Sequence, residues 1–532
     1  MTAAADGVTP FTVEVIRNAL TAIAEEMSLV VMRSARSPLL REAGDLSSAL
    51  TDDSGDLIAQ GRDIPAHLGV MGSTVQEFLK RVPPERLSPG DVWFLNLPEM
   101  GGNHLPDVKA VRPIFADGAL QAFAVSLAHW ADIGGARPGS YVPDARDAWQ
   151  EGLRIAPLRV FTADGTDREK LEMILANVRG AREREGDILA QMASTRWADG
   201  RLAEVFDRFG TATVRAAIRD LHDQSEAEMR AALRSLPPGV YEGEDWLDND
   251  GVDDERIAVR VRIEIADGEA VFDFSATDDA ARGPLNATPF TAAASVFYAI
   301  KAIAGPDVQP NAGCIRPVRI ITRPGSLLQP PLDRPLVGGN HETSQRIVDA
   351  IFRALEPVVA ERLSAGGSTT SGLLLFSGRD PRNGQWTTLY EAHGGGEGAR
   401  HDRPGGPVAR PHMSNVMNTP AEVIEANYPV LIERQALRRG SGGAGAHRGG
   451  DGQVRIYRVL APEMSLTTMV ERCIVPPYGL QGGDDGATFR ITLERASGEH
   501  QVLPGKTHVQ LYQGDRVIME TSGGGGYGPP AG

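Results

Sequence analysis

The segment at residues 120–130 alternates as a β-strand does, yet it is apolar on both of its faces. Phe123, Val125 and Leu127 fall on one side, and alanines with one serine fall on the other, because successive strand residues face opposite sides. Such a strand has no face suited to water. We therefore predict that residues 120–130 form an interior strand of a sheet.

Helical and strand-like patterns are mixed along the rest of the chain. Apolar residues at helical spacing predict helices at residues 12–32, 171–179, 187–209, 213–235, 291–303 and 344–365. Short alternating segments bounded by turn residues predict strands at residues 48–51, 57–59, 92–97, 256–265 and 269–274. The glycine-rich last third predicts antiparallel sheet. The expected fold class is mixed α/β (α+β).

The chain of 532 residues is too long for one hydrophobic core, so we expect several closely packed domains. The changes of pattern divide it into an α/β region at 1–165, a helical segment at 166–236, a mixed α/β region at 237–400 and a mainly β, glycine-rich region at 401–532.

The charge and the termini exclude several classes of partner. The net charge is −16, so nucleic acid and anionic membranes would be repelled. No apolar run is long enough to span a bilayer, and the N-terminus lacks the features of a secretory signal. The two cysteines, Cys314 and Cys473, suit a reducing compartment and are interpreted as buried small side chains. We expect a cytoplasmic protein with neither a nucleic-acid nor a membrane partner.

Two glycine runs, at residues 394–398 and 523–528, invite a phosphate-binding interpretation. Neither has the GxxxxGK[ST] order that brings a lysine to the phosphates, and neither lies cleanly between a strand and a helix. We predict that both runs are tight turns. The sequence also lacks the GxSxG motif of serine hydrolases.

The loop at residues 101–107 carries the most informative polar cluster. It reads Gly-Gly-Asn-His-Leu-Pro-Asp and follows a predicted strand, so His104 and Asp107 can face the same site. His129 ends the predicted interior strand and precedes Asp132. Imidazole and carboxylate groups together suit Zn²⁺, Mn²⁺ or Fe²⁺. By spacing alone this signal is weak, and the structural alternative is favoured: His129 as a hydrogen-bonded core histidine, Asp107 as a turn cap and Asp132 as an Asx-turn residue.

Several sequence blocks, taken in order, resemble the hydantoinase B / oxoprolinase family. They are Gly-Asp-Leu-Ser at 44–47, Ala-His-Leu-Gly at 66–69, Gly-Asn-His-Leu-Pro-Asp at 102–107, Ala-His-Trp-Ala-Asp-Ile-Gly-Gly at 128–135, and Gly-Gly-Asn-His-Glu-Thr-Ser-Gln-Arg at 338–346. The family includes caprolactamase and acetone carboxylase subunits. The resemblance implies that Asp45, His104, Asp107 and His129 bind the metal.

The resemblance also implies a function shared between two chains. This chain would be the metal-binding subunit of an ATP-dependent hydrolase that opens a hydantoin, 5-oxoproline or lactam ring, and a hydantoinase A-type ATPase subunit would bind ATP with Mg²⁺. Asp132 and His67 are expected to act as a general base or to orient the ligands. The alternatives are a subunit of an acetone- or acetophenone-type carboxylase and a non-catalytic structural subunit. The stretch Arg-Glu-Ala-Gly-Asp-Leu at 41–46 departs from the family pattern, which leaves the substrate open.

Overall fold

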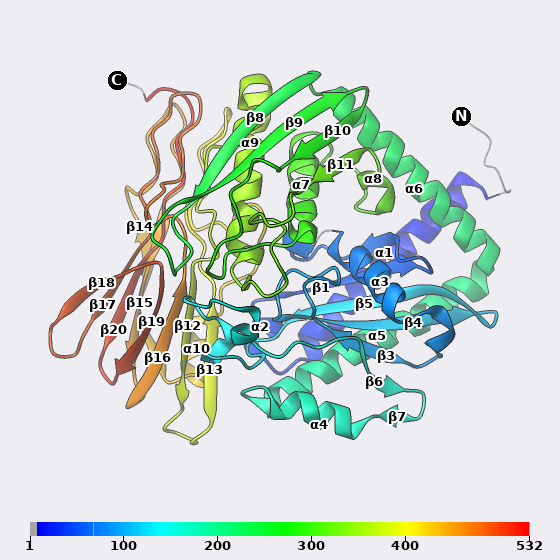
Figure 1. Cartoon of the computed structure of the whole chain (residues 1–532), viewed down its shortest axis with the longest axis horizontal. Helices are drawn as coiled ribbons and strands as arrows, with labels where there is room; N and C mark the ends of the chain where they lie inside the picture. Colours follow the sequence, from blue (N-terminus) through cyan, green and yellow to red (C-terminus); the bar gives the residue numbers. More distant parts are fainter. Residues whose placement is uncertain (1–7, 68, 531–532) are drawn as a thin grey trace.

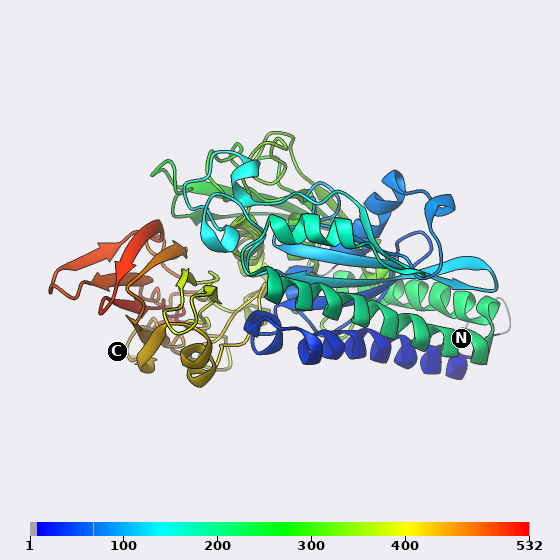
Figure 2. The same ribbon diagram turned by 90° about the horizontal axis from the view of Figure 1, so that it is seen from below.

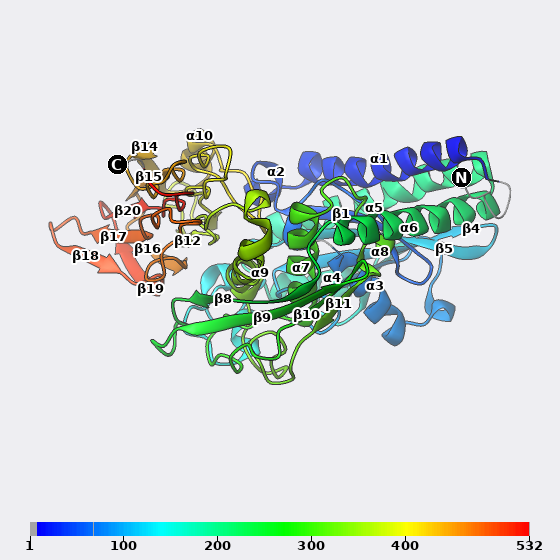
Figure 3. The same ribbon diagram turned by 90° about the horizontal axis from the view of Figure 1, so that it is seen from above.

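The computed structural model describes residues 8–67 and 69–530. Figure 1 shows an α/β part built from the N-terminal half on one side and strands of the C-terminal third on the other. Between them lie α7 (Pro289–Ile303) and α9 (Ser344–Val359), as Figure 3 also shows. The mixed α/β fold class is confirmed, whereas the division into four regions stays a prediction.

The first sheet is antiparallel and seven-stranded, in the order β2-β1-β5-β4-β3-β6-β7. Its strands are β1 (Leu46–Asp52), β2 (Leu57–Gln60), β3 (Val92–Leu95), β4 (Asp107–Ala116), β5 (Ala119–His129), β6 (Leu158–Thr162) and β7 (Gly165–Thr166). Strand β5 lies between β1 and β4, so the predicted interior strand is confirmed.

Helices cover both faces of this sheet, which explains why β5 is apolar on both sides. Phe123, Val125 and Leu127 pack on the face that carries α3 (Val70–Arg81). Ala122 and Ala124 pack on the opposite face, where three long helices lie side by side (Figure 2). These helices are α1 (Pro10–Ser34), α5 (Ala181–Phe209) and α6 (Thr211–Arg234), and α4 (Arg168–Ala176) lies beside β6. The small side chains on this face let the helices approach the sheet closely.

The second sheet has the order β11-β10-β9-β8, and only its β10–β11 pair is parallel. Its strands are β8 (Gly239–Leu247), β9 (Ile257–Ala266), β10 (Glu269–Asp273) and β11 (Val318–Ile321). Helix α9 packs against β8 and β9, and the short α8 (Ala312–Ile315) packs on α6. The helix predicted at residues 344–365 ends earlier, at Val359.

Two antiparallel sheets from the C-terminal third pack face to face around one hydrophobic cluster, so antiparallel sheet is confirmed there. One sheet contains β12 (Leu373–Arg379), β13 (Trp386–Glu391), β16 (Glu463–Met469) and β19 (Lys506–Tyr512). The other contains β14 (Val430–Arg438), β15 (Gly452–Val459), β17 (Arg490–Glu494), β18 (His500–Leu503) and β20 (Arg516–Glu520), and α10 (Ala421–Asn427) precedes it.

The two glycine runs are not tight turns, so that prediction is wrong. Residues 394–398 and 523–526 run extended beside one another and beside residues 449–450. The Gly396 amide donates to the Ser522 carbonyl at 2.9 Å, and the Gly524 amide donates to the Gly450 carbonyl at 2.9 Å. A Cβ on Gly396 would lie 2.0 Å from the Gly450 carbonyl oxygen. Glycine is required here because the backbones approach too closely for side chains.

Among the helices that the structure describes, none combines the length and the apolar character needed to cross a bilayer.

Candidate metal centre

Asp107 and His129 are brought together by strand pairing. Asp107 is the first residue of β4, His129 is the last of β5, and the two are direct partners in the antiparallel register. The loop before β4 places His104 next to this pair. Donor atoms of the three buried residues all lie within 4.8 Å of one another. Residue Gly101 permits this loop, because its φ of 71° is left-handed and a Cβ would lie 2.3 Å from the Thr74 amide nitrogen.

The orientation of His104 fixes which of its nitrogens can bind a cation. Nδ1 lies 2.8 Å from the Val337 carbonyl oxygen, which only accepts hydrogen bonds, so Nδ1 carries a proton. In the neutral ring Nε2 then presents a lone pair, and Nε2 lies 3.2 Å from Oδ1 of Asp107. Two electron-rich atoms this close, buried from water, require a proton or a cation between them.

The pKa values of this pair move in opposite directions. Burial by itself lowers the pKa of His104, but the Asp107 carboxylate, the Val337 carbonyl and Asp45 together outweigh it, and the net shift is upward. For Asp107 burial acts to raise the pKa, yet His104 and His67 hold it well below its usual range. The site therefore keeps a negative carboxylate that attracts positive charge.

Apart from its contact with Nε2 of His104, Oδ1 of Asp107 has no hydrogen-bond partner in the described structure. Nδ1 of His129 has no partner there at all, and both atoms are buried. On the other side of its ring, His129 places Nε2 3.3 Å from the Tyr141 hydroxyl, which orients the imidazole. Burial together with the charge of His104 holds the pKa of His129 well below its usual range, so the ring is neutral and can act as a ligand. The donor set fits a divalent transition metal.

Asp45 and His67 line the same cavity, of about 30 Å³, although neither belongs to the close group of three donors. The carbonyl of Asp45 accepts a hydrogen bond from the His129 amide at 3.1 Å. Burial, with the nearby Asp107, raises the pKa of Asp45 to about 6. For His67, Nδ1 lies 2.8 Å from Oγ of Ser47 and Nε2 lies 3.5 Å from Oδ2 of Asp107. His67 is thus placed to orient Asp107.

Asp132 is not among the residues that line this cavity. Its carboxylate accepts hydrogen bonds from the amides of Gly134, Gly139 and Arg179, at 2.8, 2.8 and 3.0 Å, and it also pairs with the Arg179 guanidinium. The bond to Gly134, two residues on, makes Asp132 the Asx-turn residue of the alternative interpretation. We propose no proton transfer through it.

Sequence reasoning left the block at 338–346 without assigned roles, and the structure brings part of it to the site. A π-helical turn, Gly339–Thr343, places Asn340 and His341 against the cavity. The Asn340 amide lies 3.2 Å from Nε2 of His104. His341 shares a hydrogen bond of 2.9 Å with Glu342, and its Nε2 is buried and unpartnered. The Asn-His pair at 340–341 repeats the Asn-His pair at 103–104, and this repeat is the feature of the sequence that could have identified Asn340 and His341 as site residues.

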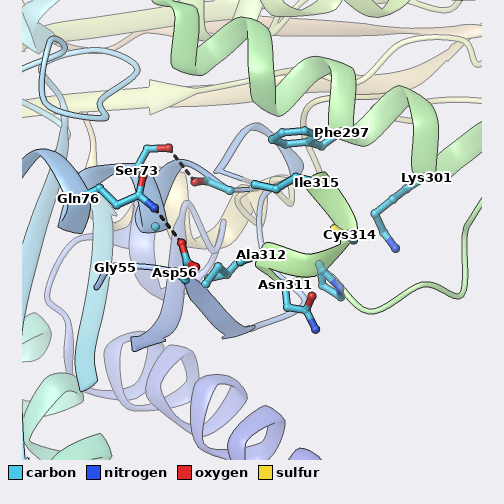
Figure 4. Close-up of a pocket in the computed structure, with 14 residues that line it drawn as sticks. Gly55, Asp56, Ser73, Gln76, Phe297, Lys301, Asn311, Ala312, Cys314 and Ile315 are labelled. Atoms are coloured by element: carbon cyan, nitrogen blue, oxygen red, sulfur yellow. Dashed lines mark hydrogen bonds between the residues drawn. The ribbon is translucent and has the colours of Figure 1, made fainter. Parts of the chain in front are cut away.

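A separate cavity of about 60 Å³, shown in Figure 4, lies between α3, α7 and α8. Gln76 and Asp56 on one side share a hydrogen bond of 3.0 Å, and Phe297, Cys314 and Ile315 lie on the other. The Cys314 thiol is buried, and burial raises its pKa, so it is a poor nucleophile. The prediction that Cys314 is a buried small side chain is confirmed.

The sequence matches the family model described as Hydantoinase B/oxoprolinase over residues 9–530. The chain belongs to this family. It is 35% identical to an uncharacterised protein of Methanocaldococcus jannaschii, covering 98% of this chain and 90% of that protein. It is 31% identical to caprolactamase subunit beta of Pseudomonas jessenii, covering 98% and 91%. It is 32% identical to 5-oxoprolinase 1 of Arabidopsis thaliana, covering 95% of this chain but only 41% of that longer protein.

Two solved structures share the fold of this chain. The ATP-dependent caprolactamase from Pseudomonas jessenii superposes with a TM-score of 0.92 at 29% identity, over 98% of this chain and 92% of that one. A nucleotide-free acetone carboxylase superposes with a TM-score of 0.88 at 19% identity, over 97% and 76%, and so shares the fold.

Proposed function

We propose that this chain is the metal-binding hydrolytic subunit of an ATP-dependent enzyme that opens a cyclic amide. The observation that carries the proposal is the convergence of buried donor atoms from His104, Asp107 and His129, with Nδ1 of His129 unpartnered. An unpartnered ring nitrogen is costly in a core histidine, whereas a ligand atom that faces a cation site is expected to lack a protein partner. Zn²⁺, Mn²⁺ and Fe²⁺ suit the donor set.

The names of relatives support the substrate class. A caprolactamase and a 5-oxoprolinase both act on an amide within a ring, and the caprolactamase is ATP-dependent. An unstrained amide resists hydrolysis. In the proposed reaction the amide oxygen attacks the γ-phosphorus of ATP and ADP leaves. Water then adds to the activated carbon and the C–N bond breaks, which leaves an acyl phosphate with a free amine. A second water releases phosphate from this acyl phosphate and gives the ring-opened amino acid.

The residues of the site divide this work. His104, Asp107 and His129 hold the cation, and Asp45 adds a carboxylate within reach of the same cavity. A divalent cation bound there supplies Lewis-acid stabilisation of the charge that develops on the substrate oxygen. His67 bonds to Ser47 through one ring nitrogen and contacts Asp107 through the other, and so holds Asp107 in place. His341 is neutral and lines the cavity, and its unpartnered Nε2 is better placed than Asp132 to accept a proton from water.

ATP activation is assigned to a partner. One close relative is named as subunit beta, so it assembles with another chain. The glycine runs, where a nucleotide-binding loop was considered, are packed backbone to backbone. We infer a hydantoinase A-type ATPase subunit that binds ATP with Mg²⁺.

The test uses the chain coexpressed with that partner. We expect ADP release coupled to ring opening of 5-oxoproline, a hydantoin or caprolactam, lost on chelation and restored by Zn²⁺, Mn²⁺ or Fe²⁺. If the complex carboxylates acetone with bicarbonate and opens none of these rings, the carboxylase function replaces this proposal. Full activity of a metal-free complex would make the chain a structural subunit.

A further inference from the structure

Arg410 brings a positive charge to the cavity of the candidate metal centre without an anionic partner. Its Nη1 is buried and unpartnered, and its Nε donates to Oγ of Ser414 at 3.1 Å. The guanidinium lines the cavity together with Asp45 and His104. Within the described ranges, no carboxylate lies within ion-pair distance of Arg410.

Other deeply buried arginines of the protein do have such partners. Arg184 pairs with Asp187 at 2.6 Å and Arg455 pairs with Glu391 at 2.8 Å. Arg472 contacts both Asp245 and Asp349 at 2.8 Å. A buried guanidinium that lacks a counter-charge is destabilising, because it has lost its hydration and no ion pair compensates for that loss. The exception at Arg410 points to an anion supplied from outside the chain.

Three carboxylates act on Arg410 without pairing with it. Asp45 lines the same cavity, Glu391 is paired with Arg455, and Glu342 accepts the Ser371 amide and shares a hydrogen bond with His341. None of them lies within ion-pair distance of the guanidinium, so its Nη1 is left for an external oxyanion.

We propose that Arg410 binds an oxyanion group of the substrate, and this rests on the proposed function. Nη1 would donate to a phosphoryl or carboxylate oxygen while the amide carbon faces His104, Asp107 and His129. The planar guanidinium suits both groups, because its paired N–H donors match two oxygens of either. The oxyanion has two possible sources: the phosphoryl group placed on the amide oxygen by the partner, or a carboxylate of the ring substrate itself.

The position of Arg410 in the chain suits a group that meets an incoming ligand. Residues 409–416 form neither helix nor strand, and Met413 and Ser414 of this segment also line the cavity. The cavity of about 30 Å³ has room for an ion and a water but not for a ring. A ring therefore enters only if part of the lining moves, and the irregular segment at 409–416 belongs to that lining.

The binding test uses the purified, metal-loaded chain with inorganic phosphate and acetate as probes in calorimetry. We expect one of these anions to bind, and Arg410→Met to weaken it at least 10-fold while the metal content stays unchanged. Arg403→Met is the matched control, since Arg403 is exposed and pairs loosely with Asp402 at 3.9 Å. Equal anion binding by the wild type and Arg410→Met, or no binding by either, overturns the proposal.

The kinetic test uses the coexpressed complex with 5-oxoproline, which has a carboxylate, and caprolactam, which has none. A fall in kcat/KM of Arg410→Met on both rings assigns the phosphoryl group, and a fall on 5-oxoproline alone assigns the carboxylate. Unchanged kcat/KM of Arg410→Met on every ring that the wild type opens overturns the proposal. If the wild type opens neither ring, the proposed function fails, and anion binding still decides the role of Arg410.

Discussion

The imidazole of His104 donates from Nδ1 to the carbonyl oxygen of Val337, 2.8 Å away and 233 residues later in the chain. This bond fixes the tautomer of His104, so that Nε2 faces Asp107 with a lone pair. The orientation of His104, in the loop at residues 101–107, is thus set by Val337 in the segment that precedes α9.

We expect His104→Ala and His129→Ala to lose the metal. The wild type should carry about one transition-metal ion per chain, because three protein donors with an open position form a complete site. Inductively coupled plasma mass spectrometry on the soluble proteins measures this. His222→Ala is the control. His222 lies on α6, is buried, does not line the cavity, and bonds to the Leu57 carbonyl. Metal retained in both site variants contradicts the ligand assignment.

Tyr141→Phe should weaken metal binding by about 10- to 100-fold without unfolding the protein, because it removes only the hydroxyl that orients His129. Competition with a chromogenic chelator gives the affinity. Tyr428→Phe is the matched control, because Tyr428 is also buried but is remote from the site. Equal affinities in the two variants would show that Tyr141 does not orient a ligand.

Glu151 supports the segment that carries the Val337 carbonyl, the partner of His104. Its Oε1 accepts hydrogen bonds from the amides of Leu336 and Val337, each at 2.8 Å. Burial raises its pKa from 4.5 to about 8, so the native state keeps a proton that the unfolded state releases. Its contribution to stability is therefore present below pH 4.5 and is lost as the pH rises to about 8.

Glu151→Gln keeps the acceptor and cannot titrate. We expect its stability to fall less than that of the wild type between pH 5 and 8, by on the order of 1 kcal/mol or more, in urea unfolding followed by circular dichroism. Glu151→Ala should be destabilised across this whole range, since the two amides lose their acceptor. Parallel pH curves for the wild type and the Gln variant contradict the assignment.

Gly396→Ala should prevent folding or lower the melting temperature sharply, because its Cβ would lie 2.0 Å from the Gly450 carbonyl oxygen. Gly200→Ala provides the contrast, since no atom lies within 4 Å of its Cβ position in α5. There alanine should stabilise by about 0.5–1 kcal/mol. Soluble yield and thermal unfolding measure both. A soluble Gly396→Ala protein with an unchanged melting temperature would show that the backbones do not pack as closely as described.

Local pattern was enough to predict the longest helices and several strands of the first two sheets. The two-faced apolar alternation of β5 required an interior strand, and helices on both faces of the sheet supply the reason. The pattern could not show why glycines recur at 394–398. Glycine permits both turns and close backbone packing, and the partners in that packing lie far away in sequence.

The sequence by itself determined the candidates for the site, and tertiary structure decided among them. His104, Asp107 and His129 could be named from their residue types and from the family resemblance, and the pairing of β4 with β5 brings them together. Asp132, only three residues from His129, turns away because nearby amides and Arg179 neutralise its carboxylate. His341 and Arg410 reach the cavity from more than 200 residues away. Spacing along a chain does not determine the direction of a side chain, and only packing between distant elements fixes which polar atoms face a shared cavity.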